Sequence, residues 1–328
     1  MMLLPPSPLQ LEPFLKQFLL EDLGHGDLTV DTLLGDYPQG GIGCLEAQSG
    51  QRRIPHLQAN MVLKQSGVFS GAWLIPALLS LVNPLLTWEP APSWCALYQT
   101  KPLLGRAPYL SVSESSGHVV LGHLVGPADA MLKVERTLLN LCQHLSGIAT
   151  QTHAFASKIA HTSCRIVHTR KTTPGLRVFE REAVLDGGGC WHRYHLGQAA
   201  MIKDNHVSLA QHIATSLPEL VAHIQARLSH MARLEVEVDT WEQFQAVIEQ
   251  THAEVILLDN FTPEACKEAV RYAEALKQRI GRHVILEASG GITLDTVQAF
   301  AETGVHLIST SQITIGAPAL DIGLDVAL

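Results

Sequence analysis

The chain has 328 residues, of which 46% are hydrophobic and 16% charged, and its formal net charge at pH 7 is −8. This composition excludes a disordered or fibrous chain, and the length provides for one large or two medium domains. The negative charge argues against a general nucleic-acid binder, so we expect any site for anionic ligands to be a local cluster of cations.

The amino-terminal segment predicts a helix and then a break. Leu11, Leu15 and Leu19 recur at helical spacing, and the pattern stops in the segment 21–27 (EDLGHGD). Three early prolines and the lack of a basic segment argue against a signal peptide. The six cysteines are scattered without a CxxC pair, which excludes a zinc ribbon and the disulfide framework of a small secreted domain. We therefore expect a cytoplasmic protein.

Short, mixed patterns occupy residues 40–126. They predict strands over Ile42–Ala47, Tyr109–Val112 and His118–Val125, and an irregular insertion over Glu89–Pro108. The stretch Gln65–Trp88 has no charged residue and is long enough to cross a membrane. Its internal prolines and asparagine leave only a short apolar run, so we expect a buried helix and no membrane span.

A long amphipathic helix is predicted to begin at Gly126-Pro127, with the proline in its first turn. Its apolar stripe comprises Met131, Val134, Leu138, Leu141, Cys142 and Leu145. Arg136 lies on the opposite side of this helix, because successive residues are about 100° apart. From the helix alone, Arg136 is a solvated arginine.

Strands and helices alternate regularly beyond residue 160. Apolar runs predict strands over Arg165–Thr169, Ala199–Lys203, Leu234–Val238, Val255–Asp259, Val284–Ala288 and Val305–Thr310. Helices are predicted over Trp241–Gln250, Pro263–Lys277 and Leu294–Glu302, with Thr262 and Thr293 as helix starts. Six or more βα units in succession predict a parallel barrel, whose active site lies at the carboxyl ends of its strands.

Polar or charged residues follow nearly every strand of this predicted barrel. They are Arg170-Lys171, Lys203-Asp204-Asn205-His206, Glu237, Asp259-Asn260, Ser289-Gly290-Gly291 and Ser309-Thr310-Ser311. Loops are usually polar, but six strand ends that all carry polar or charged residues at one edge of the barrel predict an active or binding site there.

Cations are concentrated between Cys164 and His206, where seven arginines and lysines face four acids. On an acidic protein this predicts a pocket for a multiply anionic small molecule, because arginine matches carboxylate and phosphate oxygens. The alternative is surface salt bridging. His192 and His195 suggest metal ligands, but no third ligand is spaced to join them, so we expect roles in anion binding or hydrogen bonding.

Two carboxylates, Glu235 and Glu237, share one face of a strand, and Asp259 ends the next strand. In a cationic site, such acids hold a divalent ion or a sugar hydroxyl, or stabilise a developing positive charge. The alternative is a structural pair bridged to nearby lysines. The glycines at 290 and 291 allow backbone amides to approach a phosphate, although many turns carry such a pair.

Together these motifs resemble the quinolinate phosphoribosyltransferase family (nicotinate-nucleotide pyrophosphorylase, carboxylating). The matching segments are Glu21–Thr29, Glu135–Thr150, Thr169–Arg177 (TRKTTPGLR), Gly187–Arg193, Ile202–His206 (IKDNH), Glu235–Val238, Leu257–Asn260, Glu287–Ile292 and Ala317–Asp321. The resemblance covers nearly the whole chain except about residues 75–110.

The resemblance implies an enzyme of NAD biosynthesis. It transfers phosphoribose from phosphoribosyl pyrophosphate to the ring nitrogen of quinolinate with Mg²⁺, and decarboxylation then gives nicotinate mononucleotide, pyrophosphate and CO₂. The implied fold is an N-terminal α/β sandwich domain, residues 1–150, beside an incomplete parallel α/β barrel, residues 151–328. The C-terminal tail packs back on the first domain, and in the implied homodimer that domain covers the partner's site.

The resemblance also implies roles for individual residues. The dicarboxylate would be bound by Arg170, His192, Arg193 and Lys203, with Thr169 beside them, Lys171 near both substrates and Arg136 reaching the other subunit's site. The ribose and Mg²⁺ would be served by Glu237 and Asp259, and the 5′-phosphate by Ser289, Gly290, Gly291, Ser309 and Ser311. Lys171, Lys203, Glu237 and Asp259 would be the catalytic residues.

Two departures from the family pattern and two rival functions remain. The family commonly has glycine where this chain has Ser311, which puts the affinity for phosphate in doubt, and the N-terminal domain is longer around Leu85–Pro108. One rival is a paralogue with another substrate, similar to the molybdenum-transport-associated ModD proteins, which usually lose the KDNH motif that is intact here. The other is a non-catalytic anion-binding protein, which would not need Glu237 and Asp259.

Overall fold

The computed structural model describes residues 6–34, 45–46, 52–99, 105–213 and 215–327. The chain forms two compact units. Unit 1 comprises Met1–Thr150, Pro174–Gly187 and Pro318–Leu328, and unit 2 comprises Gln151–Thr173 and Gly188–Ala317. The division differs from a single cut after residue 150, because a short internal segment and the C-terminal tail belong with unit 1.

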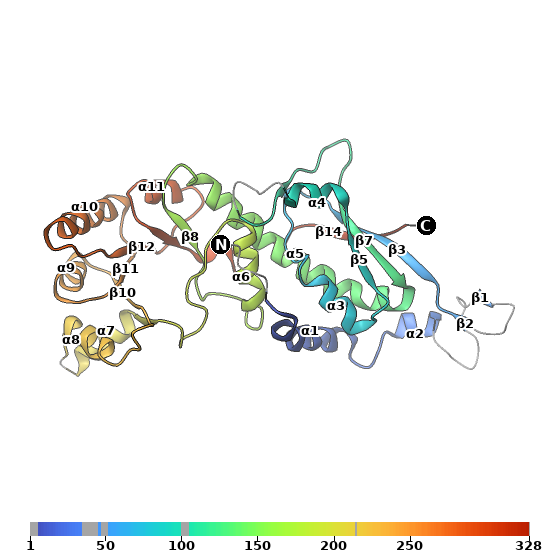
Figure 1. Cartoon of the computed structure of the whole chain (residues 1–328), viewed down its shortest axis with the longest axis horizontal. Coiled ribbons are helices and arrows are strands. Elements are labelled where there is room, and N and C mark those ends of the chain that lie inside the picture. Colours follow the sequence, from blue (N-terminus) through green and yellow to red (C-terminus); the bar gives the residue numbers. More distant parts are fainter. Residues whose placement is uncertain (1–5, 35–44, 47–51, 100–104, 214, 328) are drawn as a thin grey trace. The chain divides into compact units, whose positions relative to one another are not determined.

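Unit 1 combines helices with a four-stranded antiparallel sheet in the order β14-β3-β7-β5 (Figure 1). The strands are β3 (His56–Leu63), β5 (Thr87–Pro90), β7 (Val119–Pro127) and β14 (Ile322–Ala327), and two short pairs join β1 (Leu45–Glu46) to β2 (Arg52–Arg53) and β4 (Gly67–Val68) to β6 (Tyr109–Leu110). The helices are α1 (Pro8–Leu23), α2 (Leu28–Leu34), α3 (Ile75–Val82), α4 (Pro92–Gln99), α6 (Arg177–Asp186) and most of α5 (Ala128–Lys158). The predicted N-terminal α/β sandwich is confirmed.

The core of unit 1 forms around α5 and α6. All six residues of the predicted stripe on α5 are buried, and Arg136 is exposed, as the helical spacing predicts. On α6, the fully buried Phe179 lies 5.7 Å from Phe18 and 6.1 Å from Trp73, measured between ring centroids. Arg106 reaches the same helix, with Nη2 2.8 Å from Glu182 Oε2 and Nε 3.0 Å from Asp186 Oδ1. These contacts explain why α6 belongs to unit 1.

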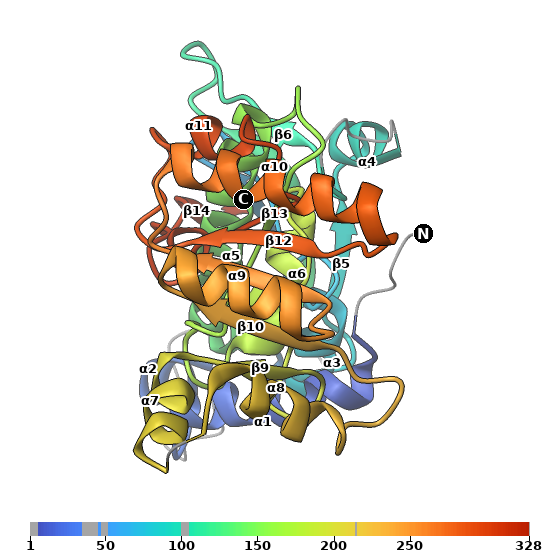
Figure 2. The ribbon, with the colours of Figure 1, turned by 90° about the vertical axis from the view of Figure 1, so that its left-hand side faces the viewer.

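Unit 2 contains a six-stranded, fully parallel sheet in the order β8-β13-β12-β11-β10-β9. The strands are β8 (Arg165–Val167), β9 (Ala200–Ile202), β10 (Leu234–Val238), β11 (Val255–Asp259), β12 (Ile285–Ser289) and β13 (Leu307–Ser309). Figure 2 shows the helices outside this sheet: α7 (Asp204–His212), α8 (Leu217–Gln225), α9 (Trp241–Gln250), α10 (Pro263–Ile280) and α11 (Val297–Ala301). Among the described residues, the edge strands β8 and β9 each pair with one neighbour and not with each other, so the barrel is incomplete, as predicted.

Several local predictions for unit 1 need correction. Pro127 ends β7, and the long helix begins one residue later, because Pro127 is still in register with His56 of β3. Residues 89–108 are not wholly irregular: α4 begins at Pro92, a favourable first-turn residue, and buries Trp94. The central strand β3 was not predicted. Of the strand expected over 42–47, only Leu45 and Glu46 lie within the described residues.

The structure also tests the predicted buried helix of unit 1 and the predicted helix starts of unit 2. The uncharged stretch holds α3, which buries Ile75, Leu78 and Leu79. Among the described residues, no helix combines the length and apolar character needed to cross a membrane. In unit 2, α11 is shorter than predicted and follows Thr296, whereas Thr262 caps α10 as expected by accepting a hydrogen bond from the backbone of Ala265.

Candidate active site

A pocket opens at the carboxyl ends of the strands of unit 2. Its volume is about 320 Å³. It is lined by Thr169, Arg170, Lys171, His192, Arg193, Met201, Lys203, Glu237, Leu257, Asp259, Glu287, Ser289 and Ser309. Ten of these thirteen residues were predicted from the sequence, and Met201, Leu257 and Glu287 were not.

The strand register explains how these side chains come together. In the parallel sheet, Glu237 is opposite Leu257, and Leu257 is opposite Glu287. Two residues further along both strands, Asp259 is opposite Ser289. Because side chains alternate along a strand, these residues all point to the inner face, with Leu257 and Glu287 deeper than Asp259 and Ser289. The deeper residues form the floor of the pocket.

Lys203 and Glu237 form an ion pair in the pocket. Lys203 Nζ lies 2.6 Å from Glu237 Oε2. Partial burial raises the pKa of Asp259, and the negative charges of Glu237 and Asp239 raise it further, while Lys203 and Lys171 act in the opposite direction. The carboxylates of Glu237 and Asp259 thus lie where a positive charge is electrostatically favoured.

Arg170 and Arg193 supply cations with unused hydrogen-bonding capacity. Arg193 donates from Nη1 to the carbonyl oxygen of Ala199 (3.1 Å) and from Nη2 to the sulfur of Met201 (3.2 Å). The Nε atoms of Arg170 and Arg193 are buried and have no hydrogen-bond partner among the described residues. Burial lowers the pKa of Arg193, and the charge of Arg170 adds to this effect. Two partly desolvated guanidinium groups in one pocket, each with an unpaired buried donor, favour an anionic ligand.

Lys171 is held by the loop that follows β13. The buried Thr314 donates a hydrogen bond from its hydroxyl to the carbonyl oxygen of Lys171 (2.8 Å), and the Thr169 hydroxyl accepts one from the Lys171 N–H (3.0 Å). The loops after β8 and β13 are therefore joined directly. The Lys171 side chain remains exposed and free to reach a ligand.

The turn after β12 requires glycine. Gly290 has φ +93° and Gly291 has φ +60°. A Cβ atom on Gly290 would lie 2.6 Å from the backbone nitrogen of Asn260, so a side chain does not fit there. This narrow turn directly follows Ser289 of the pocket, which is compatible with the predicted approach of backbone amides to a phosphate.

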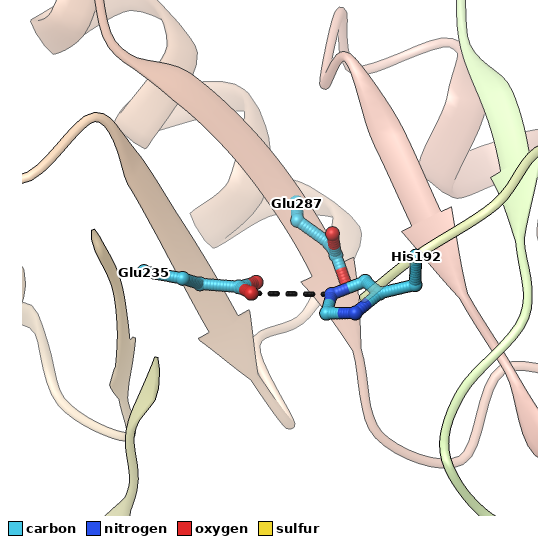
Figure 3. Close-up of side chains that lie close together, drawn as sticks. All are labelled: His192, Glu235 and Glu287. Carbon is cyan, nitrogen blue, oxygen red and sulfur yellow. Dashed lines mark ion pairs between the residues drawn. The ribbon is translucent and has the colours of Figure 1, made fainter. Parts of the chain in front are cut away.

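His192 lies between two buried carboxylates from different strands, as Figure 3 shows. Its Nε2 atom is 3.1 Å from Glu235 Oε2 and 3.7 Å from Glu287 Oε1. His195 is not part of this group: the three atoms that lie within 4.8 Å of one another come from His192, Glu235 and Glu287. Sequence spacing could not reveal the group, because its members are brought together only by the sheet. A charged residue inside the apolar run 284–288 was the one available signal.

Four predicted residues do not line the pocket. Gly290, Gly291 and Ser311 belong to the turns that directly follow the pocket residues Ser289 and Ser309, with Ser311 in a short 3₁₀ turn (Ser311–Ile313). Arg136 belongs to unit 1 and is exposed on α5. The roles assigned to all the site residues stay predictions.

Comparisons with known proteins decide the family. Residues 148–325 match the family described as "Quinolinate phosphoribosyl transferase, C-terminal domain". The chain belongs to the quinolinate phosphoribosyltransferase family. Among similar proteins of this family is a probable nicotinate-nucleotide pyrophosphorylase (carboxylating) from Bacillus subtilis, 35% identical over 320 residues, which cover 98% of this chain and 94% of that protein. A protein of the same description from Synechocystis is 33% identical over 98% and 94% of the two chains.

A solved structure supports the same assignment. The nicotinate-nucleotide pyrophosphorylase from Francisella tularensis superposes with a TM-score of 0.78 at 25% sequence identity, covering 98% of each chain. The similarity extends over both units, so the quinolinate phosphoribosyltransferase fold includes the N-terminal α/β unit as well as the incomplete barrel. The family predicted from the sequence motifs is confirmed.

Proposed function

We propose that this chain transfers phosphoribose from phosphoribosyl pyrophosphate to the ring nitrogen of quinolinate and decarboxylates the product to nicotinate mononucleotide, releasing pyrophosphate and CO₂. The observation that carries the proposal is the pair of half-buried arginines, Arg170 and Arg193, whose buried Nε atoms have no partner among the described residues, in one pocket with the carboxylates of Glu237 and Asp259. The cations suit a dicarboxylate, and the carboxylates suit the positive charge that develops on a ribose as its bond to pyrophosphate breaks.

The roles within the pocket follow from charge. Arg170, His192, Arg193 and Lys203 would hold quinolinate, with Thr169 at its edge and Lys171 between the two substrates. The turn residues Gly290, Gly291 and Ser311, with Ser289 and Ser309, would receive the 5′-phosphate. Glu237 and Asp259 would face the ribose, and their like charges fit Mg²⁺ brought in by the pyrophosphate. The ion would neutralise the leaving group.

We also infer a cytoplasmic homodimer in which Arg136 of each subunit completes the pocket of the other. Arg136 is exposed on the side of α5 opposite the buried stripe, so it is free to meet a ligand or a second copy. The net charge of −8 argues against nucleic acid as a partner.

The proposal is tested by assaying the purified protein with quinolinate, phosphoribosyl pyrophosphate and Mg²⁺ for CO₂ and nicotinate mononucleotide. We expect turnover that is lost when Mg²⁺ is chelated. Nicotinate should be a poor substrate, because the missing carboxylate would leave buried arginine donors unpaired. Equal turnover of nicotinate, or no CO₂ from quinolinate, would exclude the proposal and favour a paralogue with another substrate or a binding protein.

A further inference from the structure

The buried group of His192, Glu235 and Glu287 has no role in the function proposed above beyond contact with a dicarboxylate. Glu235 is 6% exposed and Glu287 is 1% exposed, and each has a buried carboxylate oxygen without a hydrogen-bond partner among the described residues. Two carboxylates and one imidazole so close together hold either a metal ion or a shared proton.

The hydrogen bonds of His192 decide between these two alternatives. The backbone N–H of Arg193 donates to Nδ1 of His192 (2.8 Å), so Nδ1 carries a lone pair and the single hydrogen of the neutral ring is on Nε2. A metal bound at Nε2 would require that hydrogen to move to Nδ1, where it would meet the Arg193 N–H. The group therefore holds protons.

The same contacts show which carboxylate of the group carries a proton in addition to the one on His192. The Nε2–H of His192 lies closer to Glu235 than to Glu287 and donates to Glu235. Burial lowers the pKa of His192, but Glu235 and Glu287 raise it more, so its net pKa shift is upward. The Arg193 N–H opposes a second proton on this ring. Glu287 is left beside a like charge in a buried position, where its ionised form is costly.

The surroundings of Glu287 agree with this assignment. The pKa of Glu287 is raised to about 7, mainly by burial and further by the charge of Glu235 on β10, which is separated from β12 by one strand. His192, a hydrogen bond from Ser309 of β13 and the charge of Lys203 after β9 act in the opposite direction. Glu287, unlike Glu235, also lines the pocket. A protonated carboxyl group is thus available on the pocket floor near neutral pH.

Decarboxylation of a pyridine carboxylate needs such a group. When CO₂ leaves, the electron pair of the broken bond stays on the ring carbon, and a proton must replace the lost carboxylate. Among the other described groups that line the pocket, the arginines bind their protons too tightly, Lys203 is paired with Glu237, and His192 is paired with Glu235. The pKa of Asp259 is also raised, but Asp259 lies nearer the mouth of the pocket than Glu287, and Lys171 is exposed, so Glu287 is the acid on the floor.

We propose, on the basis of the function proposed above, that Glu287 is the acid that supplies this proton. The bond between the ring carbon and the carboxylate breaks, its electron pair remains on the carbon beside the cationic ring nitrogen, and CO₂ departs. The O–H bond of Glu287 breaks as the new C–H bond forms. After the product leaves, the Glu287 carboxylate takes a proton from water. Glu235, held by His192, keeps Glu287 protonated between turnovers.

The first test separates the two chemical steps in Glu287→Gln, which keeps the size of the side chain but removes its acidic proton. In single turnovers we expect pyrophosphate release within about threefold of the natural protein. CO₂ release should fall by about 100-fold, within the usual range for loss of a general acid, and the N-ribosylated dicarboxylate should accumulate. Glu254→Gln is the matched control: Glu254 precedes β11 at the opposite end of the barrel, and a glutamine can still accept the Leu234 N–H. Both steps should keep their natural rates in this control.

Equal loss of both steps in Glu287→Gln, or unchanged CO₂ release, would overturn the assignment of Glu287. No pyrophosphate release from the natural protein would instead overturn the proposed function, so the two failures are distinguishable.

A second test uses Glu235→Gln and does not depend on the folding of the first variant. Decarboxylation needs the acid form of Glu287, so its rate in the natural protein should fall as the pH rises through about 7. Removing the charge of Glu235 lowers the pKa of Glu287, so this fall should move to lower pH. A profile that stays in place would overturn the proposal.

Discussion

At the scale of single residues, Arg193 combines a fixed position with a free donor. Two of its nitrogens are held by Ala199 and Met201, and its Nε has no partner among the described residues. Arg193→Lys keeps the charge and removes the planar fork, so kcat/KM for quinolinate should fall by the equivalent of about 1–3 kcal/mol. Arg170→Lys should behave in the same way.

Steady-state kinetics with each substrate varied in turn measures this effect. The KM for phosphoribosyl pyrophosphate serves as the internal control and should change less. If both lysine variants keep natural kinetics, neither arginine contacts the dicarboxylate.

The stability of the substrate-free protein should depend on Glu287. Its pKa is about 7 in the folded protein and near 4.5 in an ordinary environment, so its stabilising contribution is complete below about pH 4.5 and is lost as the pH rises through 7. By the usual conversion of a pKa difference, the loss is of the order of 3 kcal/mol. Glu287→Gln lacks this loss, so its stability relative to the natural protein should rise between pH 4.5 and 7 and then stay level. Denaturant titrations from pH 4 to 8.5 test this, and parallel stability curves would contradict it.

At the scale of elements, α5 lies so close to the C-terminal tail that replacing one of its glycines by alanine should destabilise the protein, although this change usually stabilises a helix. Replacing glycine by alanine inside a helix usually stabilises it by about 1 kcal/mol. A Cβ atom on Gly147 would lie 2.9 Å from the carbonyl carbon of Pro318 and closer still to its oxygen. We therefore expect Gly147→Ala to lower the melting temperature and to make the tail more sensitive to proteolysis.

Ser157→Ala is the control for Gly147→Ala, because Ser157 is exposed on the same helix and reports helix propensity alone. It should raise the melting temperature slightly. A Gly147→Ala protein as stable as this control would show that the tail can move away from the helix without cost.

A helix or strand could be predicted from the sequence where its pattern of apolar and polar residues matches its burial in the folded protein. The strands β10 and β11 were predicted to the residue, because β10 alternates valine and leucine with two glutamates and β11 is an apolar run that ends in Asp259. The strand β3 was missed although His56, Gln58 and Asn60 alternate with the apolar Leu57, Ala59 and Met61, which is a pattern typical of a strand. The place of α6 in unit 1 depends on ion pairs with Arg106, about 80 residues earlier, and no local pattern contains them.

In the candidate site, too, some residues could be predicted from local sequence and others depend on contacts between distant segments. Residues at strand ends, such as Lys203 and Asp259, were predictable because a parallel barrel brings these ends together. Glu287 was not, because it lies within a strand and its protonation depends on Glu235 and His192. Its partners are set by the strand order, which the sequence does not display.

At the scale of the whole molecule, the inferred dimer predicts complementation between two inactive variants. Arg136→Ala should fold and dimerise but be nearly inactive, because the dicarboxylate loses a charge-assisted partner. Lys203→Ala should be inactive through its own pocket. A mixed dimer has one pocket free of both substitutions, so random exchange of equal amounts should restore roughly a quarter of the natural activity, since about half of the dimers are mixed and each has one intact site of two.

Subunit exchange is verified by mass, with each variant alone as the control. If exchange is complete and no activity returns, Arg136 does not serve the partner's pocket.

The pairing of β14 with β3 also affects how the chain folds during its synthesis. The strand β3 ends at Leu63, and its neighbour β14 begins at Ile322, about 260 residues later. At a ribosomal rate of about 5–20 residues per second, β3 is completed roughly 13–50 s before that neighbour exists. During this interval one edge of β3 offers unpaired backbone donors and acceptors to any other strand. The nascent chain therefore has a defined period in which chaperones and competing chains can reach β3.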